Sequence, residues 1–343
     1  MTKNEARQVI LKIKEDFGNK LVILGHHYQS DDIVELSDYV GDSLELARRV
    51  THLKEAKIIV FCGVHFMAET AAILAPDKDV YIPDKNAGCP LADMANIDEV
   101  LEAWEVISKI GKAVVPITYI NSTASIKSFC GQMGGTVCTS GNSQDVFRWA
   151  LNNFETIFFL PDRNLGRNTA YSLNIEDSYI CEWDSTKKNN IDYIEDLKNA
   201  KVILWNGYCP IHWPIFSVND IKRLRNLYPN IKIIVHPEAG PETVKASDCY
   251  GSTAKIINFA YEQKMGTKIA IGTEYNLVNR LANKLKGQVD VLPLKRIKCE
   301  DMERITIEKL ASTLINLDKS EKVIVDSFIA DNALVSIKNM LTI

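Results

Sequence analysis

Three cysteines that are far apart in the chain are candidates for one ligand set. Cys89 in AGCPLAD and Cys209 in NGYCPIH each follow a nearby glycine and precede a proline, a loop context in which packing explains a cysteine poorly, and Cys299 lies in KCEDM. The N-terminal residues read as a charged amphipathic helix rather than a signal sequence, so we expect a cytoplasmic protein with reduced thiols. No two of the eight cysteines form a C-x-x-C pair, which excludes zinc fingers and thioredoxin-like motifs.

These cysteines occupy equivalent positions in a threefold repeat. The first unit places four residues at offsets of 0, 17, 37 and 63, namely His26, Ser43, Gly63 and Cys89. The third unit has the same offsets, at His236, Thr253, Thr273 and Cys299. The second unit has offsets of 0, 21, 43 and 90, at Tyr119, Ser140, Asp162 and Cys209. Its 27 extra residues fall mostly in a polar stretch near 174–200. Three such units would bring one cysteine each to a common axis.

Short apolar runs rich in β-branched residues alternate with amphipathic helices along the chain. Examples are KLVILGHHYQ, AKIIVFCGV, AVVPITYIN and IKIIVHPE. Such runs are typical of buried parallel strands, which deliver polar residues at their carboxyl ends. We therefore predict an α/β fold with three pseudo-threefold-related three-layer αβα domains, whose short parallel sheets surround a central active-site cleft. The predicted units are residues 1–108, residues 109–228 with the polar insertion, and residues 229–343 with the C-terminal helices.

Three converging thiolates suit a soft metal centre. Tetrahedral zinc with an open position is one possibility, and a 4Fe-4S cluster with one iron that no cysteine binds is the other. Zinc sites normally contain a closely spaced pair of ligands, whereas the nearest two of these cysteines are 90 residues apart, so the spacing favours the cluster. Burial as a small hydrophobe is the commonest role of a free cysteine and the one expected of Cys62 and Cys249.

The first strand of each unit ends in two chemically useful side chains. Because side chains alternate along an extended chain, the two members of each pair point to the same side. The pairs are His26 and Tyr28, Tyr119 and Asn121, and His236 and Glu238. A single histidine at a strand end is more often structural, but three pairs in register indicate proton transfer or hydrogen bonding in one cleft.

Small hydroxyl residues follow these pairs where the next helix is expected to begin. They are Ser43, Ser140, Ser252 and Thr253. Free N–H groups at a helix start bind carboxylate or phosphate oxygens, although ordinary capping explains any one hydroxyl equally well. Together they predict a small substrate with several negative groups. The formal charge of −4, without a long basic run, argues against nucleic acid as a partner, and no apolar run is long enough to span a membrane.

From about residue 20 to 315 the chain resembles the quinolinate synthase family of NAD biosynthesis. The matching stretches, in order, are ILGHHYQSDDIVELSDYVGDSLELAR, FCGVHFMAETAAILAPDKDVYIPDKNAGCPLAD, YINSTASIK, CTSGN, LPDRNLGRN, GYCPIH, HPE, GSTAKI, GTEYNLVNRL and CEDM. The resemblance implies a transferase that condenses iminoaspartate with dihydroxyacetone phosphate to quinolinate, phosphate and water. It also implies one 4Fe-4S cluster whose open iron is a Lewis acid, and an upstream L-aspartate oxidase or dehydrogenase as the source of iminoaspartate.

Carried over residue by residue, the resemblance implies cluster ligation by Cys89, Cys209 and Cys299. It implies acid–base roles for Tyr28 and Glu238, with His212 as a third catalytic residue close to the cluster. Substrate contacts are expected from His26, Ser43, Tyr119, Asn121, Ser140, His236, Glu238, Ser252 and Thr253. Two departures from the family pattern are expected to be a surface excursion near 174–200 and a lengthened loop at CGQMGG, residues 130–135.

Two other classes of protein remain open. A radical enzyme of the diphthamide synthase type is similar in its three repeated domains and three remote cysteines, but it would use S-adenosylmethionine and a protein substrate. The strand-end pairs and the small anionic cleft argue against it. A non-catalytic iron–sulfur sensor could use the same cysteines, but it would need a surface for DNA or protein that the charge distribution does not offer.

Overall fold

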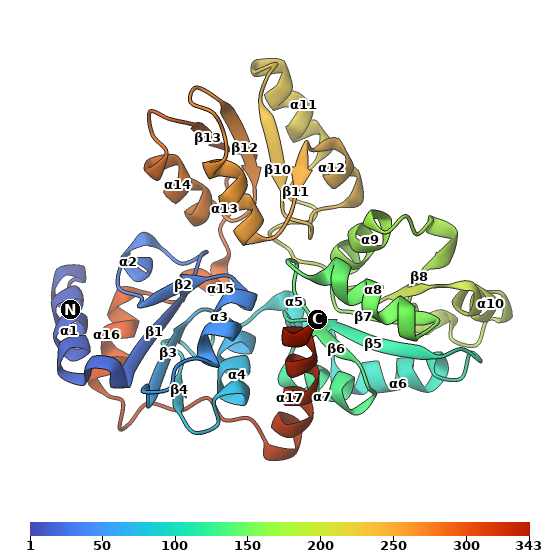
Figure 1. Ribbon diagram of the computed structural model, residues 1–343, viewed down its shortest axis with the longest axis horizontal. Helices are drawn as coiled ribbons and strands as arrows, with labels where there is room; N and C mark the ends of the chain where they lie inside the picture. The colour runs from blue at the N-terminus through green and yellow to red at the C-terminus, as the bar shows by residue number, and fades with distance from the viewer.

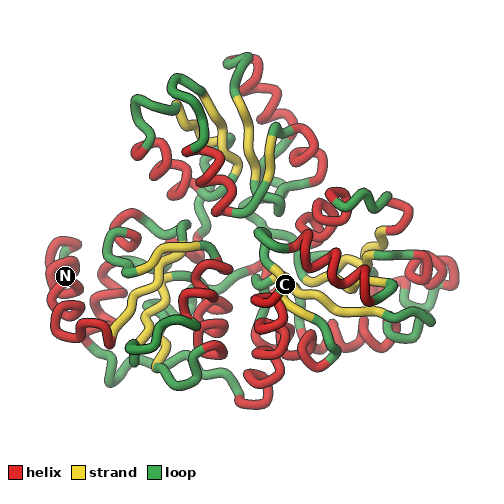
Figure 2. The backbone as a smooth tube through the Cα atoms, viewed as in Figure 1, coloured by secondary structure: helices red, strands yellow, loops and turns green.

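The computed structural model describes all residues from Met1 to Ile343 and has three α/β lobes around a common centre (Figure 1). Each lobe contains one sheet with helices on both faces (Figure 2). All strand pairings are parallel. The predicted fold class is therefore confirmed. No helix combines the length and the apolar character that crossing a membrane requires.

The first lobe alternates strands and helices after an initial helix. Its elements are α1 (Lys3–Phe17), the 3-10 helix η1 (Gly18–Lys20), β1 (Leu21–His26), α2 (Asp31–Val34), β2 (Tyr39–Gly41), α3 (Ser43–Val50), β3 (Ile58–Cys62), α4 (His65–Leu74), β4 (Asp79–Tyr81) and α5 (Pro90–Asp93). Helix α1 begins with a capping box in which Thr2 and Glu5 satisfy each other's backbone N–H groups. Every residue of β1 is buried, as expected for a strand covered by helices on both faces.

The second lobe has the same plan with an additional edge. Its elements are α6 (Ile97–Ile107), β5 (Val114–Tyr119), α7 (Ala124–Gln132), β6 (Thr136–Cys138), α8 (Ser143–Asn153), β7 (Thr156–Leu160), α9 (Arg163–Ser172), η2 (Asp177–Tyr179), β8 (Ile180–Glu182), η3 (Ser185–Lys187), α10 (Ile191–Asn199) and β9 (Val202–Leu204). The polar stretch 174–200 is thus an ordered extension of the sheet rather than a simple surface excursion. It is held because Trp183, Tyr193 and Leu197 are buried in the core of this lobe.

The third lobe repeats the plan of the first. Its elements are α11 (Val218–Leu227), β10 (Lys232–Val235), α12 (Pro241–Ala246), β11 (Cys249–Tyr250), α13 (Thr253–Tyr261), β12 (Lys268–Gly272), α14 (Tyr275–Lys284), β13 (Asp290–Pro293) and α15 (Glu300–Glu303). Two C-terminal helices follow, α16 (Ile307–Ile315) and α17 (Ser327–Thr342).

The three sheets share one strand order. The orders are β2-β1-β3-β4, β6-β5-β7-β9-β8 and β11-β10-β12-β13, so the second sheet differs only by the added β8. The repeat extends to single hydrogen bonds: the N–H of Ile23 donates to Asp38 at 2.8 Å, and the N–H of Ile233 donates to Asp248 at 2.7 Å. Both residues of the second bond lie 210 positions after their counterparts, as Cys299 lies after Cys89.

Two helices next to the predicted domain boundaries pack against a different lobe from the one to which the sequence assigned them. Helix α6 lies in the predicted first unit, but its Val100 and Ile107 share a core with Phe129 and Phe158 of the second lobe. Helix α11 likewise packs on the core of the third lobe, through Ile221 and Leu224. Each lobe therefore begins with the helix that precedes its first strand.

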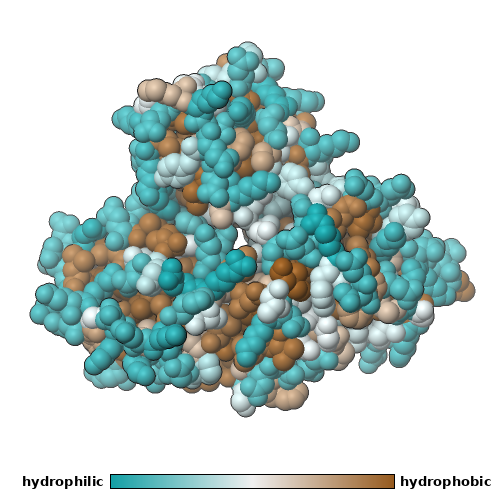
Figure 3. Space-filling model, viewed as in Figure 1, coloured by the Kyte–Doolittle hydropathy of each residue, from teal (hydrophilic) through white to brown (hydrophobic).

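The C-terminal helices leave the third lobe, with which they were grouped, and join the other two. Helix α16 packs on α1, and α17 packs on α7, between the two lower lobes of the view in Figure 1. Contact with α7 is close at Gly131, where a Cβ atom would lie 2.0 Å from the Asn332 carbonyl oxygen. The CGQMGG stretch is therefore the end of α7 against which α17 packs, not a lengthened loop. Figure 3 shows hydrophobic residues gathered along this junction.

Candidate active site

A cavity of about 360 Å³ lies where the three lobes meet. It is lined by thirteen of the fourteen candidate site residues that the sequence predicts: His26, Tyr28, Ser43, Cys89, Tyr119, Asn121, Ser140, Cys209, His212, His236, Glu238, Thr253 and Cys299.

 The fourteenth, Ser252, does not line the cavity. The fold therefore brings together side chains that are up to 273 positions apart in the sequence.

Each of the three thiols lies beside the backbone N–H groups of the turn that follows it. Cys89 and Cys299 are the N-cap residues of the short helices α5 and α15, and Cys209 precedes a turn. The N–H of Ala92 faces the sulfur of Cys89, that of Ile211 faces Cys209, and that of Met302 faces Cys299. Burial raises the pKa of all three thiols, to about 11 for Cys299, so a bound cation is needed to hold them as thiolates.

The histidines at the ends of β1 and β10 have matching hydrogen bonds. Nδ1 of His26 accepts from the N–H of Tyr28 at 3.1 Å, and Nδ1 of His236 accepts from the N–H of Glu238 at 3.4 Å. Burial lowers the pKa of both imidazoles to about 3. At neutral pH both rings are therefore neutral, and each has its proton on Nε2, where it can donate to a bound molecule.

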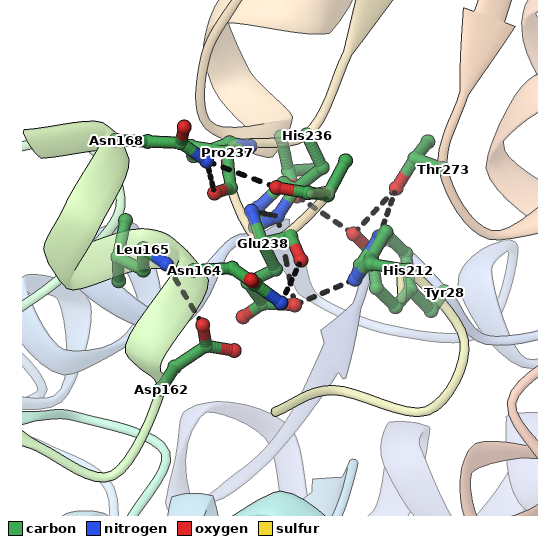
Figure 4. A network of polar contacts seen from close by, with 12 residues as sticks. Tyr28, Asp162, Asn164, Leu165, Asn168, His212, His236, Pro237, Glu238 and Thr273 are labelled. Carbon is green, nitrogen blue, oxygen red and sulfur yellow. Dashed lines mark hydrogen bonds and ion pairs between the residues drawn. The ribbon is translucent and has the colours of Figure 1, made fainter. Parts of the chain in front are cut away.

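A chain of hydrogen bonds links Tyr28 to Glu238 (Figure 4). The hydroxyl of Tyr28 lies 2.7 Å from Oγ1 of Thr273, and that atom lies 3.1 Å from Nε2 of His212. Nδ1 of His212 lies 2.6 Å from Oε2 of Glu238. Because Nδ1 faces a carboxylate, it carries the proton, and Nε2 accepts from Thr273. A proton can therefore pass from Tyr28 through Thr273 to His212, where Glu238 stabilises the positive charge.

Two buried carboxyl groups at the centre have pKa values that are shifted in opposite directions. Burial raises the pKa of Glu238, but the imidazoles of His236 and His212 and a hydrogen bond with Tyr119 outweigh it, so the net shift is downward. Burial and the nearby Glu238 raise the pKa of Asp162 well above its ordinary value. Glu238 is thus ionised at neutral pH, whereas the carboxyl group of Asp162 holds its proton more strongly than an ordinary aspartate does. One oxygen of each carboxyl group is buried without a hydrogen-bond partner.

The loops that carry these groups are each held by the neighbouring lobe. Arg280 of α14 donates to Asp31 and to two carbonyl groups within residues 27–31. Asn168 of α9 donates to two carbonyl groups within residues 237–239, at 2.8 and 2.9 Å. Glu69 of α4 accepts from the first N–H of α7, at 3.1 Å. Each lobe thus positions the strand-end loop of the next lobe around the ring.

The four predicted hydroxyl residues differ in their positions relative to the first turn of the helix that follows them. Ser43 and Thr253 are the first residues of α3 and α13, and both line the cavity. Ser140 also lines the cavity, but it precedes Asn142, the N-cap of α8, so it is not at the helix start as predicted. Ser252 is the N-cap of α13, and its hydroxyl accepts from the third N–H of that helix. Ordinary capping accounts for the hydroxyl of Ser252, which does not line the cavity.

Comparison with known proteins decides the family. The profile of the family described as quinolinate synthetase A protein matches residues 8–342. The quinolinate synthase of Bacillus licheniformis is 45% identical over 349 residues, which cover 100% of this chain and 94% of that protein. Those of Bacillus cytotoxicus and Bacillus anthracis are 43% and 42% identical over 348 residues, which cover 99% of this chain and 94% of each. The chain belongs to the quinolinate synthetase A protein family.

Three further buried residues of this family member lie near the site without lining its cavity. Thr273 and Asp162 stand at the predicted repeat position after the second strand of their units, so their position was predictable but their contacts were not. Lys127 lies inside α7, where its Nζ donates to the carbonyl of Ser122 at 2.5 Å. Burial lowers the pKa of Lys127 to about 8, so it stays charged at neutral pH. A lysine inside an amphipathic helix gives no sequence signal of burial.

Glu274 makes the stability of this family member depend on pH. The carboxyl group is buried and caps α14, and burial raises its pKa from 4.5 to about 8. Between these values the folded chain holds a proton that the unfolded chain has lost, so stability falls as pH rises from about 4.5 to about 8. Glu274→Gln keeps the capping oxygen and removes the titration, so we expect about 1–3 kcal/mol more stability at pH 8.

Thermal unfolding of the protein at pH 5 and pH 8, without added metal, measures this effect. The difference between the two midpoints should shrink in Glu274→Gln and stay unchanged in Glu242→Gln, an exposed glutamate in the first turn of α12. An equal difference in wild type and Glu274→Gln would show that Glu274 does not titrate in this range.

Proposed function

We propose that this protein is a quinolinate synthase that condenses iminoaspartate with dihydroxyacetone phosphate to quinolinate, phosphate and water. The observation that carries the proposal is the shared cavity, in which three thiols from three lobes face the chain of hydrogen bonds from Tyr28 to Glu238. Membership of the family over the whole chain supports it. We place the reaction in cytoplasmic NAD biosynthesis, downstream of an L-aspartate oxidase or dehydrogenase.

The proposed cofactor is one 4Fe-4S cluster held by Cys89, Cys209 and Cys299. The backbone N–H groups beside the three sulfur atoms support this assignment, because such hydrogen bonds stabilise cluster thiolates and tune the cluster potential. When bound, the cluster would supply a Lewis-acidic iron that no cysteine binds and that polarises a hydroxyl leaving group.

The polar side chains of the cavity would hold the substrates. The Nε2–H groups of His26 and His236 are donors, and the buried Oδ1 of Asn121 has no partner in the protein. Ser43 and Thr253 add hydroxyl and backbone N–H donors at the starts of two helices, which favour carboxylate and phosphate oxygens. This distribution of donors around the cavity matches a dicarboxylate and a phosphate ester.

Proton transfer would run through Tyr28. Burial and the charge of Glu238 raise the pKa of Tyr28, so the phenol is protonated at rest and is a donor. Loss of its proton through Thr273 to His212 would produce a phenolate that removes a proton from the condensing substrates, and the reverse transfer would protonate a leaving hydroxyl. Glu238 keeps His212 oriented and stabilises its protonated form.

Substitution of Thr273 distinguishes proton transfer along this route from direct proton transfer between Tyr28 and the substrate. Thr273→Val removes the bridging hydroxyl at nearly constant volume, so we expect kcat to fall about 10²- to 10³-fold, within the range for lost acid–base catalysis. Thr273→Ser keeps the hydroxyl and should retain most of the activity. Anaerobic steady-state kinetics with iron counted in each variant measures this effect. Equal kcat in Thr273→Val and wild type would remove Thr273 from the route.

An anaerobic assay of quinolinate formation tests the function itself. Reconstituted protein should make quinolinate and phosphate only when iminoaspartate and dihydroxyacetone phosphate are both present. Omission of either substrate, or removal of the cluster, should abolish the product. A protein that carries its full iron content and makes no quinolinate would overturn the proposal.

A further inference from the structure

Three donors of different chemistry converge at one wall of the cavity. They are the Sγ atom of Cys209, an imidazole nitrogen of His212 and a carboxylate oxygen of Glu238, and these atoms all lie within 4.8 Å of one another. His212 and Glu238 are almost fully buried, with 1% and 2% of their surfaces exposed. All three residues line the cavity, so a fourth position beside them is open to a water molecule or a small ligand.

Two of these donors are close in the sequence, as metal ligands often are, whereas the three cysteines are far apart. Cys209 and His212 are separated by two residues, and the carbonyl of Cys209 accepts from the N–H of His212 at 3.1 Å, which closes a tight turn. Such close spacing is common among zinc ligands. The oxygen Oε1 of Glu238 is buried and has no partner, so the carboxylate has an unused lone pair in the same place.

The distances are close to those of a tetrahedral site. Zinc takes thiolate, imidazole and carboxylate ligands at about 2.0–2.3 Å, which separates the ligand atoms by roughly 3–4 Å. Nδ1 of His212 and Oε2 of Glu238 are 2.6 Å apart and would move apart slightly, while Cys209 would move inward. Nε2 of His212 would then carry the proton and donate to Thr273, which is 3.1 Å away.

We propose that the cluster-free chain binds one Zn²⁺ ion through Cys209, His212 and Glu238. The thiol of Cys209 releases its proton to solvent when the Zn–S bond forms, and the imidazole proton moves from Nδ1 to Nε2, so about one proton leaves per ion. The site shares Cys209 with the proposed cluster and takes His212 and Glu238 from the proton route. Zinc and the cluster therefore exclude each other, a consequence that rests on the proposed function, whereas zinc binding itself does not.

Metal titration of the cluster-free, full-length protein under anaerobic conditions tests the site. The double variant Cys89→Ser/Cys299→Ser lacks two of the three thiols but keeps the three proposed ligands, so its Zn²⁺ affinity should stay within about threefold of wild type. Cys209→Ser and His212→Gln should each weaken binding roughly 100-fold or more, because even residues that only support ligands change metal affinity about 10- to 100-fold. Cys249→Ser, which replaces a partly exposed thiol elsewhere, should bind as wild type does.

The opposite pattern would overturn the proposal. Loss of binding in the double variant, with full binding in His212→Gln, would mean that the three cysteines hold the zinc. Co²⁺ gives a second measurement: a thiolate-to-cobalt charge-transfer band should appear in the double variant and be absent in Cys209→Ser, with circular dichroism confirming that each variant is folded. A double variant that is folded but shows no such band would contradict the site.

The quinolinate assay keeps this result separate from the proposed function. His212→Gln retains the three cysteines and should still acquire about four irons per chain if they hold a 4Fe-4S cluster. Zinc binding with the predicted variant pattern, in a protein that makes no quinolinate, would support the zinc site and reject the function. Quinolinate formation in a protein whose cluster-free form does not bind zinc would do the reverse.

Discussion

Replacement of Cys89, Cys209 or Cys299 by serine should abolish the proposed iron–sulfur cluster and the proposed formation of quinolinate together. Each lobe contributes one of these thiols to the cavity, so no neighbouring cysteine can substitute for a lost ligand. We expect wild-type protein reconstituted under anaerobic conditions to contain about four irons per chain and each variant to lose most of that iron. Quinolinate formation should fall roughly 100-fold or more in each case.

The matched control for this prediction is Cys249→Ser. Cys249 is a free, partly exposed cysteine in β11, so its replacement neither buries a hydroxyl group nor removes a proposed ligand. Iron content and absorbance of the reconstituted protein should match wild type in this variant. Full iron in any one of the three ligand variants would contradict the ligand assignment.

Tyr28→Phe should keep the proposed cluster and lose turnover. The substitution removes one oxygen atom, the first donor of the route to Thr273 and His212, and leaves the ring packed against His26 at a centroid distance of 4.6 Å. Acid–base catalysis of this kind contributes about 10²–10⁴-fold, so we expect kcat to fall by about 10³-fold with little change in iron content. Anaerobic steady-state kinetics and iron analysis on the same preparation measure both.

Tyr81→Phe is the matched control for Tyr28. Tyr81 is also buried, and its hydroxyl donates to the carbonyl of Leu317 in the first lobe, away from the cavity residues. This variant loses a structural hydrogen bond, so a small decrease in stability with unchanged kcat is the expected result. Unchanged turnover in Tyr28→Phe would remove Tyr28 from the mechanism.

The threefold arrangement could be predicted from the sequence because parallel strands constrain it strongly. Their buried runs end abruptly in polar residues, and the carboxyl ends of parallel strands share one edge of a sheet. His26 and His236 therefore lie at equivalent positions and accept equivalent hydrogen bonds. His236 follows His26 by 210 residues, the same interval that separates Cys299 from Cys89. The same reasoning predicted that the three cysteines would share one cavity, and all three line it.

Contacts between lobes were beyond such reasoning. Thr273 was visible as a repeat position, but its bonds to Tyr28 and His212 depend on how the first and third lobes meet. The packing of α17 on α7 of the second lobe could not be predicted either, because an amphipathic helix does not specify which of several apolar surfaces it covers. Ser252 was assigned to the cleft because a capping hydroxyl and an anion-binding hydroxyl have the same sequence pattern.

Our central proposal is that the three thiols hold a cluster whose open iron faces the chain of hydrogen bonds that links Tyr28 to Glu238. Mössbauer spectroscopy of anaerobically reconstituted protein, recorded with and without quinolinate, tests it most directly. We predict a 4Fe-4S spectrum in which one iron of the four changes its environment when quinolinate is added, while the other three do not. A spectrum in which all four irons stay the same in saturating quinolinate would contradict the claim.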